Sequence, residues 1–475
     1  MKGNIKHAIM VLACTALALP ANILAQETTR LITLSEAREL ALQNNKGITK
    51  SRLTLEQVRE EAKAIKSYNY PRVKGFALDL YSTAKGSYTF GGFQQPLSIP
   101  LPPSIGQLIP EAITDEAGNY FLNQVVDVPE TTLDYKLGNI FVGGVMLTQP
   151  IYMGGKITAG CRIASRAQAV AAENIRLTES QVILNTDEAY MMAVLARKLN
   201  DVAYSYKELL DELHRNVQDA INHGVRTRTD LLKVQVKLNE VELAIQKTEN
   251  GMRLSMMSLC HICGLPLNTP IDINTEQFDT DQFTIVNGEG SSIETRPEIA
   301  MLQGMTDIAK QNIKLVRSDY MPQLGMFTGY SYVNGGKVIG EKVIDKGFFA
   351  VGAMLQVPIL TFGERTHKIR SAKTQYKIAQ TEQQDLTEKM QLELAQADNI
   401  YTEAMTELKI TQRSLEEAKE NMDLARQQYD AGLEPISQLL EAQAMWQQTY
   451  AEHVTAKCQL QIAYTRLLKA RGSLK

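Results

Sequence analysis

Cysteine, tryptophan and long apolar runs are all scarce in this chain. Its 475 residues include five cysteines, one tryptophan and only 6% aromatic residues. Cys14 lies in an N-terminal apolar run, and four further cysteines are too few for a disulfide framework. After that run no stretch approaches the roughly 18 apolar residues that a membrane-spanning helix needs. If the mature protein crosses a membrane, it must do so with strands.

An excess of charge of one sign and the common catalytic motifs are also missing. The net charge of -3 gives no electrostatic reason to expect nucleic acid as a partner. The sequence lacks a phosphate loop of the GxxxxGK[ST] type, and no Ser-His-Asp order or carboxylate pair is prominent. We therefore predict that the protein is not an enzyme and has no catalytic residues, cofactor or metal site.

The stretch Cys260-His261-Ile262-Cys263 resembles a metal or redox motif. Two cysteines and one histidine leave a closed zinc site one ligand short. We interpret these side chains as packing residues at a helix end, and a local disulfide between Cys260 and Cys263 remains an alternative.

The first 25 residues are typical of a secretory signal. Lys2 and Lys6 precede an apolar run, and Ala25 provides a small residue at the predicted cleavage site. Lipidation at Cys14 is the weaker alternative, because the apolar run before it is too short and continues past it.

Residues far apart in the chain repeat at one spacing. Residues 144–155 and 352–363 are identical at six of twelve positions. The same offset of 208 relates Gly224 to Gly432 and Gly264 to Gly472. Such self-similarity indicates a tandem duplication. We expect a signal peptide at 1–25, a first repeat at 26–265, a linker at 266–297 and a second repeat at 298–475.

Each repeat begins with a helix of moderate length, at 48–67 and at 298–318, and two strands follow it. The strands are predicted at about 71–83, 139–149, 323–333 and 347–357. In 139–149 and 347–357, apolar residues alternate over about ten positions, which matches the length and period of a tilted membrane strand. An ordinary sandwich strand is the alternative interpretation.

Two very long helices are predicted next in each repeat. Residues 161–223 and 364–431 contain no glycine or proline, so each stretch can extend about 95–100 Å as a helix. The long helices are expected at about 156–222, 229–263, 364–430 and 436–470. Helices of this length need lateral partners, as in coiled coils.

Four strands are too few to close a membrane barrel alone, and open strand edges are not tolerated in hydrocarbon. If these strands span a membrane, several copies must share one barrel. Two copies give eight strands with an interior filled by side chains, whereas three give twelve strands and a lumen.

The chain resembles the TolC-like outer membrane efflux proteins. The resemblance rests on the duplicated plan, on LITLSEARELALQNN near the N-terminus, on QPIYMGGK around Pro150, and on NHGVRTRTDLLKVQ and DAGLEPISQLLEAQ at residues 222–235 and 430–443. It implies a membrane β-barrel plus a long α-helical coiled-coil barrel. As a trimer, the protein would form a 12-stranded barrel in the outer membrane and a 12-helix tunnel in the periplasm.

The resemblance also implies a passive exit duct of a tripartite efflux system. Its implied partners are two further copies, outer membrane lipid, a periplasmic membrane-fusion adaptor and an inner membrane pump of the RND type. The outlet of a type I protein secretion system is one alternative. A periplasmic coiled-coil scaffold without a barrel is another, and it would leave the strand pairs unexplained.

Site residues follow from the resemblance by position. The adaptor-docking turns are Gly224, Val225, Thr229, Leu232, Gly432, Leu433, Ser437 and Leu440. The periplasmic aperture is Arg226, Arg228, Asp230, Gln438 and Glu441, where Gln438 replaces an expected acid. The junctions between strands and helices are Pro71, Pro150, Gly155, Pro322, Pro358 and Gly363. We expect a threonine or serine in each turn, such as Thr229 or Ser437, to cap the next helix.

The first repeat carries about 43 extra residues between Pro71 and Pro150. The proline density of this insertion argues against a regular helix or a central strand there. We predict that roughly residues 86–137 lie outside the cell.

Overall fold

The structure is a computed structural model and describes residues 30–275, 278, 293–338 and 341–474. The predicted signal peptide, with Cys14, lies outside the described residues, as does half of the predicted linker. The chain divides into two compact units, and each takes segments from both repeats. The helical unit comprises the described residues up to 62, 162–310 and 373–475, and the strand unit comprises 63–161 and 311–372.

Helices dominate the chain outside the strand pairs. Their bounds are α2 Leu34–Asn44, α3 Lys46–Lys66, α5 Lys156–Asn222, α6 Arg228–Ile262, α8 Pro297–Ser318, α9 Glu364–Asp430 and α10 Ile436–Ala470. Helices α5 and α9 each have 67 residues, and α6 and α10 each have 35. None of the helices in the described residues has the length and apolar character that would let it cross a membrane.

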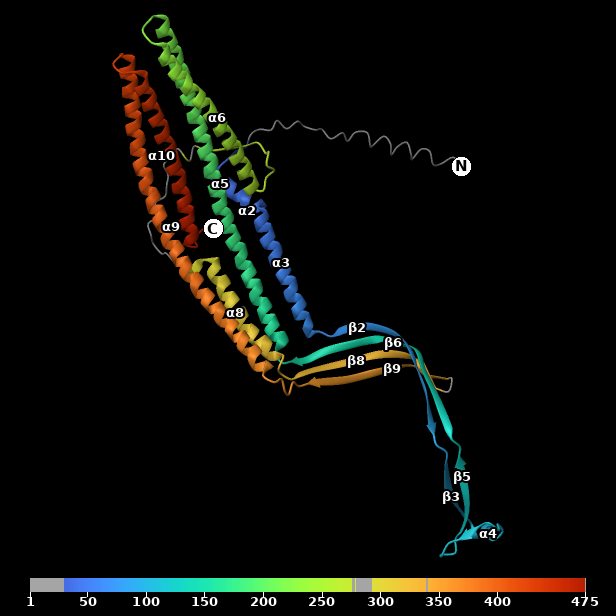
Figure 1. The fold of residues 1–475 in the computed structure, drawn as a ribbon. Coiled ribbons are helices and arrows are strands. Elements are labelled where there is room, and N and C mark those ends of the chain that lie inside the picture. Colours follow the sequence, from blue (N-terminus) through green and yellow to red (C-terminus); the bar gives the residue numbers. More distant parts are fainter. Residues whose placement is uncertain (1–29, 276–277, 279–292, 339–340, 475) are drawn as a thin grey trace, which may run out of the picture. The chain divides into compact units, whose positions relative to one another are not determined.

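The helical unit contains two helical hairpins, α5–α6 and α9–α10, whose turns lie at the same end of the unit (Figure 1). Helix α6 runs beside the part of α5 nearest the turn, and α2 and α3 run beside the remainder. In the same way, α10 runs beside the part of α9 nearest the turn, and α8 runs beside the remainder. Polar contacts cross these pairs: the Ser51 and Thr178 hydroxyls are 2.9 Å apart, and the Thr306 hydroxyl donates to Gln383 at 2.9 Å. The shorter helices therefore give the long ones the lateral partners that they need.

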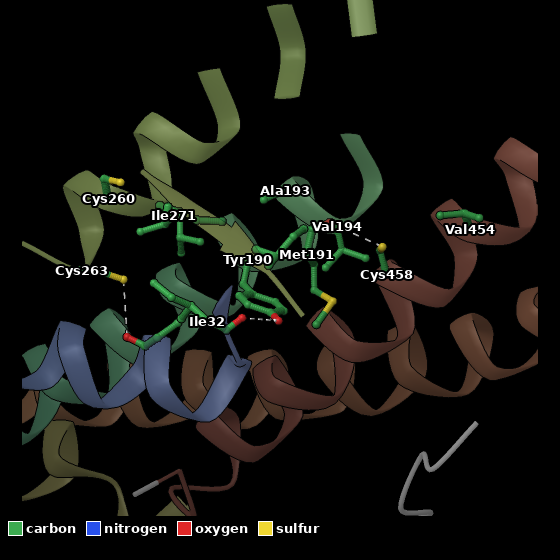
Figure 2. Close-up of a cluster of buried hydrophobic side chains, with 14 residues drawn as sticks. Ile32, Tyr190, Met191, Ala193, Val194, Cys260, Cys263, Ile271, Val454 and Cys458 are labelled. Carbon is green, nitrogen blue, oxygen red and sulfur yellow. Dashed lines mark hydrogen bonds between the residues drawn. The ribbon is translucent and has the colours of Figure 1, made fainter. Parts of the chain in front are cut away.

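A buried core joins α2, α5, α6 and α10 (Figure 2). The Tyr190 hydroxyl donates to the main-chain oxygens of Ile32 and Asn274, at 3.1 and 2.9 Å. Ile32 belongs to β1 Arg30–Ile32, which pairs in parallel with β7 Ile271–Ile273. The N-terminal segment and the start of the expected linker therefore form a small sheet over this core.

The cysteines in this core are free thiols, so the alternative of a Cys260–Cys263 disulfide is wrong. Figure 2 shows the sulfur atoms of Cys260 and Cys263 well apart from each other. The Cys263 thiol donates to the Ala37 carbonyl at 3.6 Å, and the Cys458 thiol donates to the Met191 carbonyl at 3.6 Å. Burial raises the pKa of Cys263 to about 11 and that of Cys458 to about 12.

This burial predicts which thiols react. Iodoacetamide at pH 8 should modify the half-buried Cys161 in the native protein and leave Cys260, Cys263 and Cys458 unmodified. The thiolate is the reactive form, and the raised pKa values keep the buried thiols protonated. Peptide mass mapping after labelling, with and without urea, measures this. Rapid native labelling of Cys458 would contradict the burial that we describe.

The strand unit contains a four-stranded antiparallel sheet in the order β2-β6-β8-β9. Its strands are β2 Arg72–Phe90, β6 Thr131–Met153, β8 Gln323–Val338 and β9 Glu341–Gln356. Gly144 lies in the middle of the sheet, opposite Phe76 on β2 and Ser331 on β8. A Cβ at Gly144 would lie 2.4 Å from the Tyr330 carbonyl oxygen, so this close approach requires glycine.

The strands are longer than predicted, and β6 does not end at Pro150. It bulges between Pro150 and Tyr152 and continues to Met153. At its other end it pairs with β2 through polar residues, such as Lys136 opposite Lys85. Apolar alternation marks only the middle of each strand, because polar residues at the ends still contribute backbone hydrogen bonds.

The insertion after β2 forms a second, three-stranded sheet in the order β3-β5-β4. Its elements are β3 Phe93–Leu101, the short helix α4 Pro103–Gly106, β4 Ile113–Thr114 and β5 Tyr120–Val128. Pro96 and Pro100 lie in β3, which is an edge strand, whereas the central strand β5 has no proline. The insertion therefore does contain a central strand, and the prediction against one is wrong for β5, because β5 lies in a stretch without proline. The prolines of β3 are tolerated because β3 is an edge strand.

Candidate functional site at the helix turns

The two turns have the same backbone geometry. Gly224 and Gly432 adopt φ values of +74° and +75°. The amide of Val225 donates to the Ala220 carbonyl at 2.8 Å, and the amide of Leu433 donates to the Gln428 carbonyl at 2.9 Å. These are the hydrogen bonds of a Schellman motif, in which a glycine in the left-handed region ends a helix. Both long helices therefore stop by the same local mechanism.

The helices that follow begin differently, and neither begins with the expected cap. Thr227, not Thr229, is the N-cap of α6, and it forms a capping box with Asp230. Pro435 is the N-cap of α10 and provides no side-chain hydrogen bond, while Ser437 lies exposed within the first turn. The prediction that Thr229 and Ser437 cap these helices is wrong, because α6 begins one residue earlier and α10 begins after a proline.

Each turn presents one exposed apolar side chain directly after its glycine. Val225 is 74% exposed and Leu433 is 77% exposed. The two leucines further along differ, since Leu232 is 55% exposed whereas Leu440 is 6% exposed and belongs to the core behind the turns. Leu440 is therefore inaccessible to a docking partner in this structure.

The side chain of Arg226 connects the two turns. Its guanidinium lies 4.5 Å from the centre of the Tyr429 ring and donates to the Tyr429 carbonyl oxygen at 3.4 Å. Tyr429 lies near the end of α9 and is 8% exposed. Burial raises the pKa of the Tyr429 hydroxyl, so this residue stays neutral at physiological pH.

Asp230 and Arg228, which sequence places beside Arg226, have other roles. The Asp230 carboxylate accepts from the Thr227 hydroxyl at 2.8 Å and lies 4.0 Å from Lys233. Arg228 is exposed, and its side chain has no partner among the described residues. Asp230 therefore stabilises the start of α6 rather than pairing with either arginine.

Gln438 and Glu441 are both exposed and lie three residues apart on α10. This spacing places them on one face of the helix. By contrast, the neighbouring positions Leu439, Leu440 and Gln443 on the same helix are buried. The structure therefore leaves both polar side chains accessible.

A buried cluster lies directly behind the turns and draws on α5, α6, α9 and α10. Its members include Leu210, Val217, Val234 and Ile436, all between 0% and 1% exposed. Tyr206 in this cluster has a pKa of about 12, raised by burial. The cluster holds the two hairpins together and so sets both turns at one level.

The residues expected at the junctions lie at the ends of strands and helices. Pro71 and Pro322 directly precede β2 and β8, and Pro358 follows β9. Gly155 and Gly363 directly precede α5 and α9 with φ values of +86° and +89°. Pro150 is the exception, because it lies within β6.

Two residues of these sites were not predicted. Tyr429 was missed because its partner Arg226 lies 203 residues away. The available signal was its position three residues before Gly432, which matches Ile221 before Gly224. Gly154 was also missed: it has φ +62°, and a Cβ there would lie 2.6 Å from the Ser318 carbonyl oxygen.

Two long helical hairpins joined in sequence to a four-stranded sheet define the fold of an outer membrane channel. The solved structure of CusC, which was described for its transmembrane channel formation, matches with a TM-score of 0.71 at 15% identity, and the match covers 93% of both chains. The chain belongs to the outer membrane efflux protein family, which matches residues 130–264 and 290–473.

Two curated relatives agree with this assignment. The alkaline protease secretion protein AprF of Pseudomonas aeruginosa is 22% identical over 73% of this chain and 74% of its own length. The outer membrane protein TolC of Vibrio cholerae is 21% identical over 64% and 70%. The predicted family, function and location are confirmed: the protein is an exit duct of the outer membrane whose helical part lies in the periplasm.

Proposed function

We propose that three copies of this chain form the duct, with a closed 12-stranded barrel in the membrane and a 12-helix tunnel in the periplasm. The observation that carries this proposal is the open sheet. Within the described residues, β2 and β9 each pair on one side only. Unpaired backbone groups are costly in hydrocarbon, so each open edge requires a neighbour. Pairing β2 of one copy with β9 of the next satisfies both edges.

An exposed apolar stripe on α6 supports the same assembly. Its members, more than half exposed, are Val236, Leu243 and Leu254. At 3.6 residues per turn they share one face, directly opposite the buried face formed by Val234, Leu238, Val241 and Ile245. An apolar face of this length is typical of a helix with a second partner. We assign that partner to the neighbouring copy.

The stripe provides a test of assembly. Leu243→Glu should shift the purified protein from trimer toward monomer, because it places a carboxylate in an apolar contact. Size-exclusion chromatography with light scattering measures the mass. Gln246→Glu adds the same charge at an exposed position on the flank of the stripe and should leave the trimer intact. A Leu243→Glu protein that remains fully trimeric would count against this interface.

The turns are the proposed contact with a periplasmic adaptor. Gly224, Val225 and Leu232 in one turn, and Gly432 and Leu433 in the other, present accessible small and apolar surface. Thr229 and Ser437 are exposed beside them. An inner membrane pump of the RND type, acting through that adaptor, would supply the energy for transport.

The same level is the proposed aperture. Arg226 holds the two hairpins of one chain together through Tyr429. Three copies of Glu441 would form one acidic ring that favours cations, with Gln438 as a neutral neighbour. We assign closure mainly to the Arg226–Tyr429 contact, since Asp230 is already engaged by Thr227.

A type I secretion outlet is the second candidate, and the likeness to AprF favours it. The two candidates differ in cargo. In a strain that lacks this protein, an efflux outlet is identified by increased susceptibility to small toxic compounds, whereas a secretion outlet is identified by a polypeptide missing from the medium. Both phenotypes should be measured with the neighbouring adaptor and pump genes intact.

The second sheet, within residues 86–137, is proposed to lie outside the cell.

A further inference from the structure

A cavity of about 620 Å³ lies in the strand unit, at the ends of the strands. It is lined by residues from β2, β6, β8 and β9 and from the ends of α3, α5 and α8. Its apolar lining includes Ile65, Met153, Ile157, Leu315, Phe327 and Met354. The size and apolar character suit a ligand with a hydrocarbon chain.

One edge of the cavity is cationic. Arg72 lies at the first position of β2, and Lys156 lies at the first position of α5. Lys156 forms an ion pair with Asp319 at 2.8 Å, whereas the Arg72 guanidinium lies 4.0 Å from the centre of the Tyr68 ring. No carboxylate is among the described residues that line the cavity. A positive charge therefore remains available for an anionic group.

A hydrogen-bond acceptor in the lining is unsatisfied. The Gln149 side-chain amide donates to the carbonyls of Asn69 and Pro150, both at 3.0 Å. Its oxygen is buried and has no hydrogen-bond partner in the described part of the chain. A buried acceptor without a donor is costly, so a ligand that carries N–H groups would be favoured here.

The cavity also lies where the strands of an outer membrane protein leave the bilayer. Its strand residues are at the ends of β2, β6, β8 and β9 that adjoin the helices. Phosphate head groups and aromatic residues such as Tyr68 concentrate at this level of a membrane protein. The head groups of membrane lipid therefore lie at the level of this site.

We propose that this cavity binds one glycerophospholipid of the outer membrane, with an acyl chain against Phe327 and Met354. The phosphate lies beside Arg72 and Lys156, and an amine head group donates to the Gln149 side-chain oxygen. The site therefore selects a phospholipid with a primary amine, such as phosphatidylethanolamine, over phosphatidylcholine, which has no N–H donor. The bound lipid joins the strand ends to the first turns of the helices.

Glycines in the lining provide variants that fill the cavity without disturbing its walls. A Cβ at Gly160 would lie 3.4 Å from Ile65, its only neighbour within 4 Å. A Cβ at Gly325 would lie 3.7 Å from the Gln149 carbonyl oxygen. Both distances are ordinary van der Waals contacts. Gly160→Leu also replaces a glycine within α5 by a better helix former, so it should fold.

The test is native mass spectrometry of the whole protein purified in a mild detergent. Delipidated wild type should bind phosphatidylethanolamine several-fold more tightly than phosphatidylcholine. Arg72→Gln with Lys156→Gln should weaken phosphatidylethanolamine binding by at least about tenfold, since charge-assisted hydrogen bonds are lost. Gly160→Leu should abolish specific binding. Lys85→Gln removes a cation from the far end of β2 and should bind like wild type.

Two results would overturn the proposal: equal lipid binding by wild type and Gly160→Leu, or no phospholipid binding by wild type. Binding of an anionic detergent but of no phospholipid would assign the cavity to cargo instead and would also overturn it. Trimer mass and export are measured on the same variants, and Gly160→Leu should retain both. Loss of the lipid site is thereby distinguished from failure of the proposed duct.

Discussion

Gly432→Trp should abolish export by this duct while the protein remains an intact trimer. A Cβ at Gly432 would have no atom within 4 Å, so the indole would project from the turn beside the exposed Leu433. It would cover the surface on which the adaptor is proposed to dock. The backbone at φ +75° adds strain of about 1 kcal/mol, which the large core behind the turn can tolerate.

Efflux is measured as drug susceptibility in a strain that carries the adaptor and pump but lacks the native duct. Susceptibility should return to the level of the empty strain, and adaptor retained on the purified duct should fall by at least about tenfold. Gly432→Asn is the matched control, because asparagine tolerates the left-handed region and adds little bulk. Efflux of Gly432→Trp at the wild-type level would contradict docking at this turn, and equal loss in both variants would point to strain.

Arg226→Ala should open the duct in the absence of its partners. The substitution removes the contact of the guanidinium with the Tyr429 ring and its hydrogen bond to the Tyr429 carbonyl. Loss of about 1–2 kcal/mol per chain would shift an open-to-closed equilibrium by roughly 5–30-fold for each contact. Single-channel conductance in planar bilayers should rise, and cells should become permeable to a large antibiotic that is normally excluded.

The controls separate this contact from the loss of charge. Arg228→Ala removes an equal charge two residues away, where the side chain has no described partner, and should conduct like wild type. Tyr429→Phe keeps both the ring face and the main-chain carbonyl and should also remain closed. An Arg226→Ala channel with wild-type conductance would show that closure rests on other contacts.

Local signals were sufficient to predict the helices. The stretches without glycine or proline correspond to α5 and α9, and Gly224 and Gly432 end them through the same backbone hydrogen bonds. A helix end depends on a few neighbouring residues, so its position can be predicted from sequence. The start of a helix is harder to predict from sequence, because Thr227, Thr229 and Ser437 all have a hydroxyl that could cap a helix. The backbone geometry of each turn decides which residue is the N-cap, and it is Thr227 for α6 and Pro435 for α10.

Strand limits and site contacts depended on residues distant in the chain. Strand β6 extends beyond its apolar centre because β2 and β8 provide hydrogen-bond partners on both sides. Leu232 and Leu440 occupy equivalent positions in the two repeats, yet one is exposed and the other is buried. Two nearly equivalent sequences therefore present different surfaces once their hairpins lie side by side.

The sequence by itself determined the duplicated order of strands and long helices, the glycines at the turns and the resemblance to outer membrane efflux proteins, because these features depend on local propensity and on spacing. Only the tertiary structure decided that Arg226 reaches Tyr429, that Asp230 is used as a helix cap, and that the strand ends enclose a cavity beside Arg72. Each of these depends on side chains brought together by packing, and neither propensity nor spacing encodes such distances.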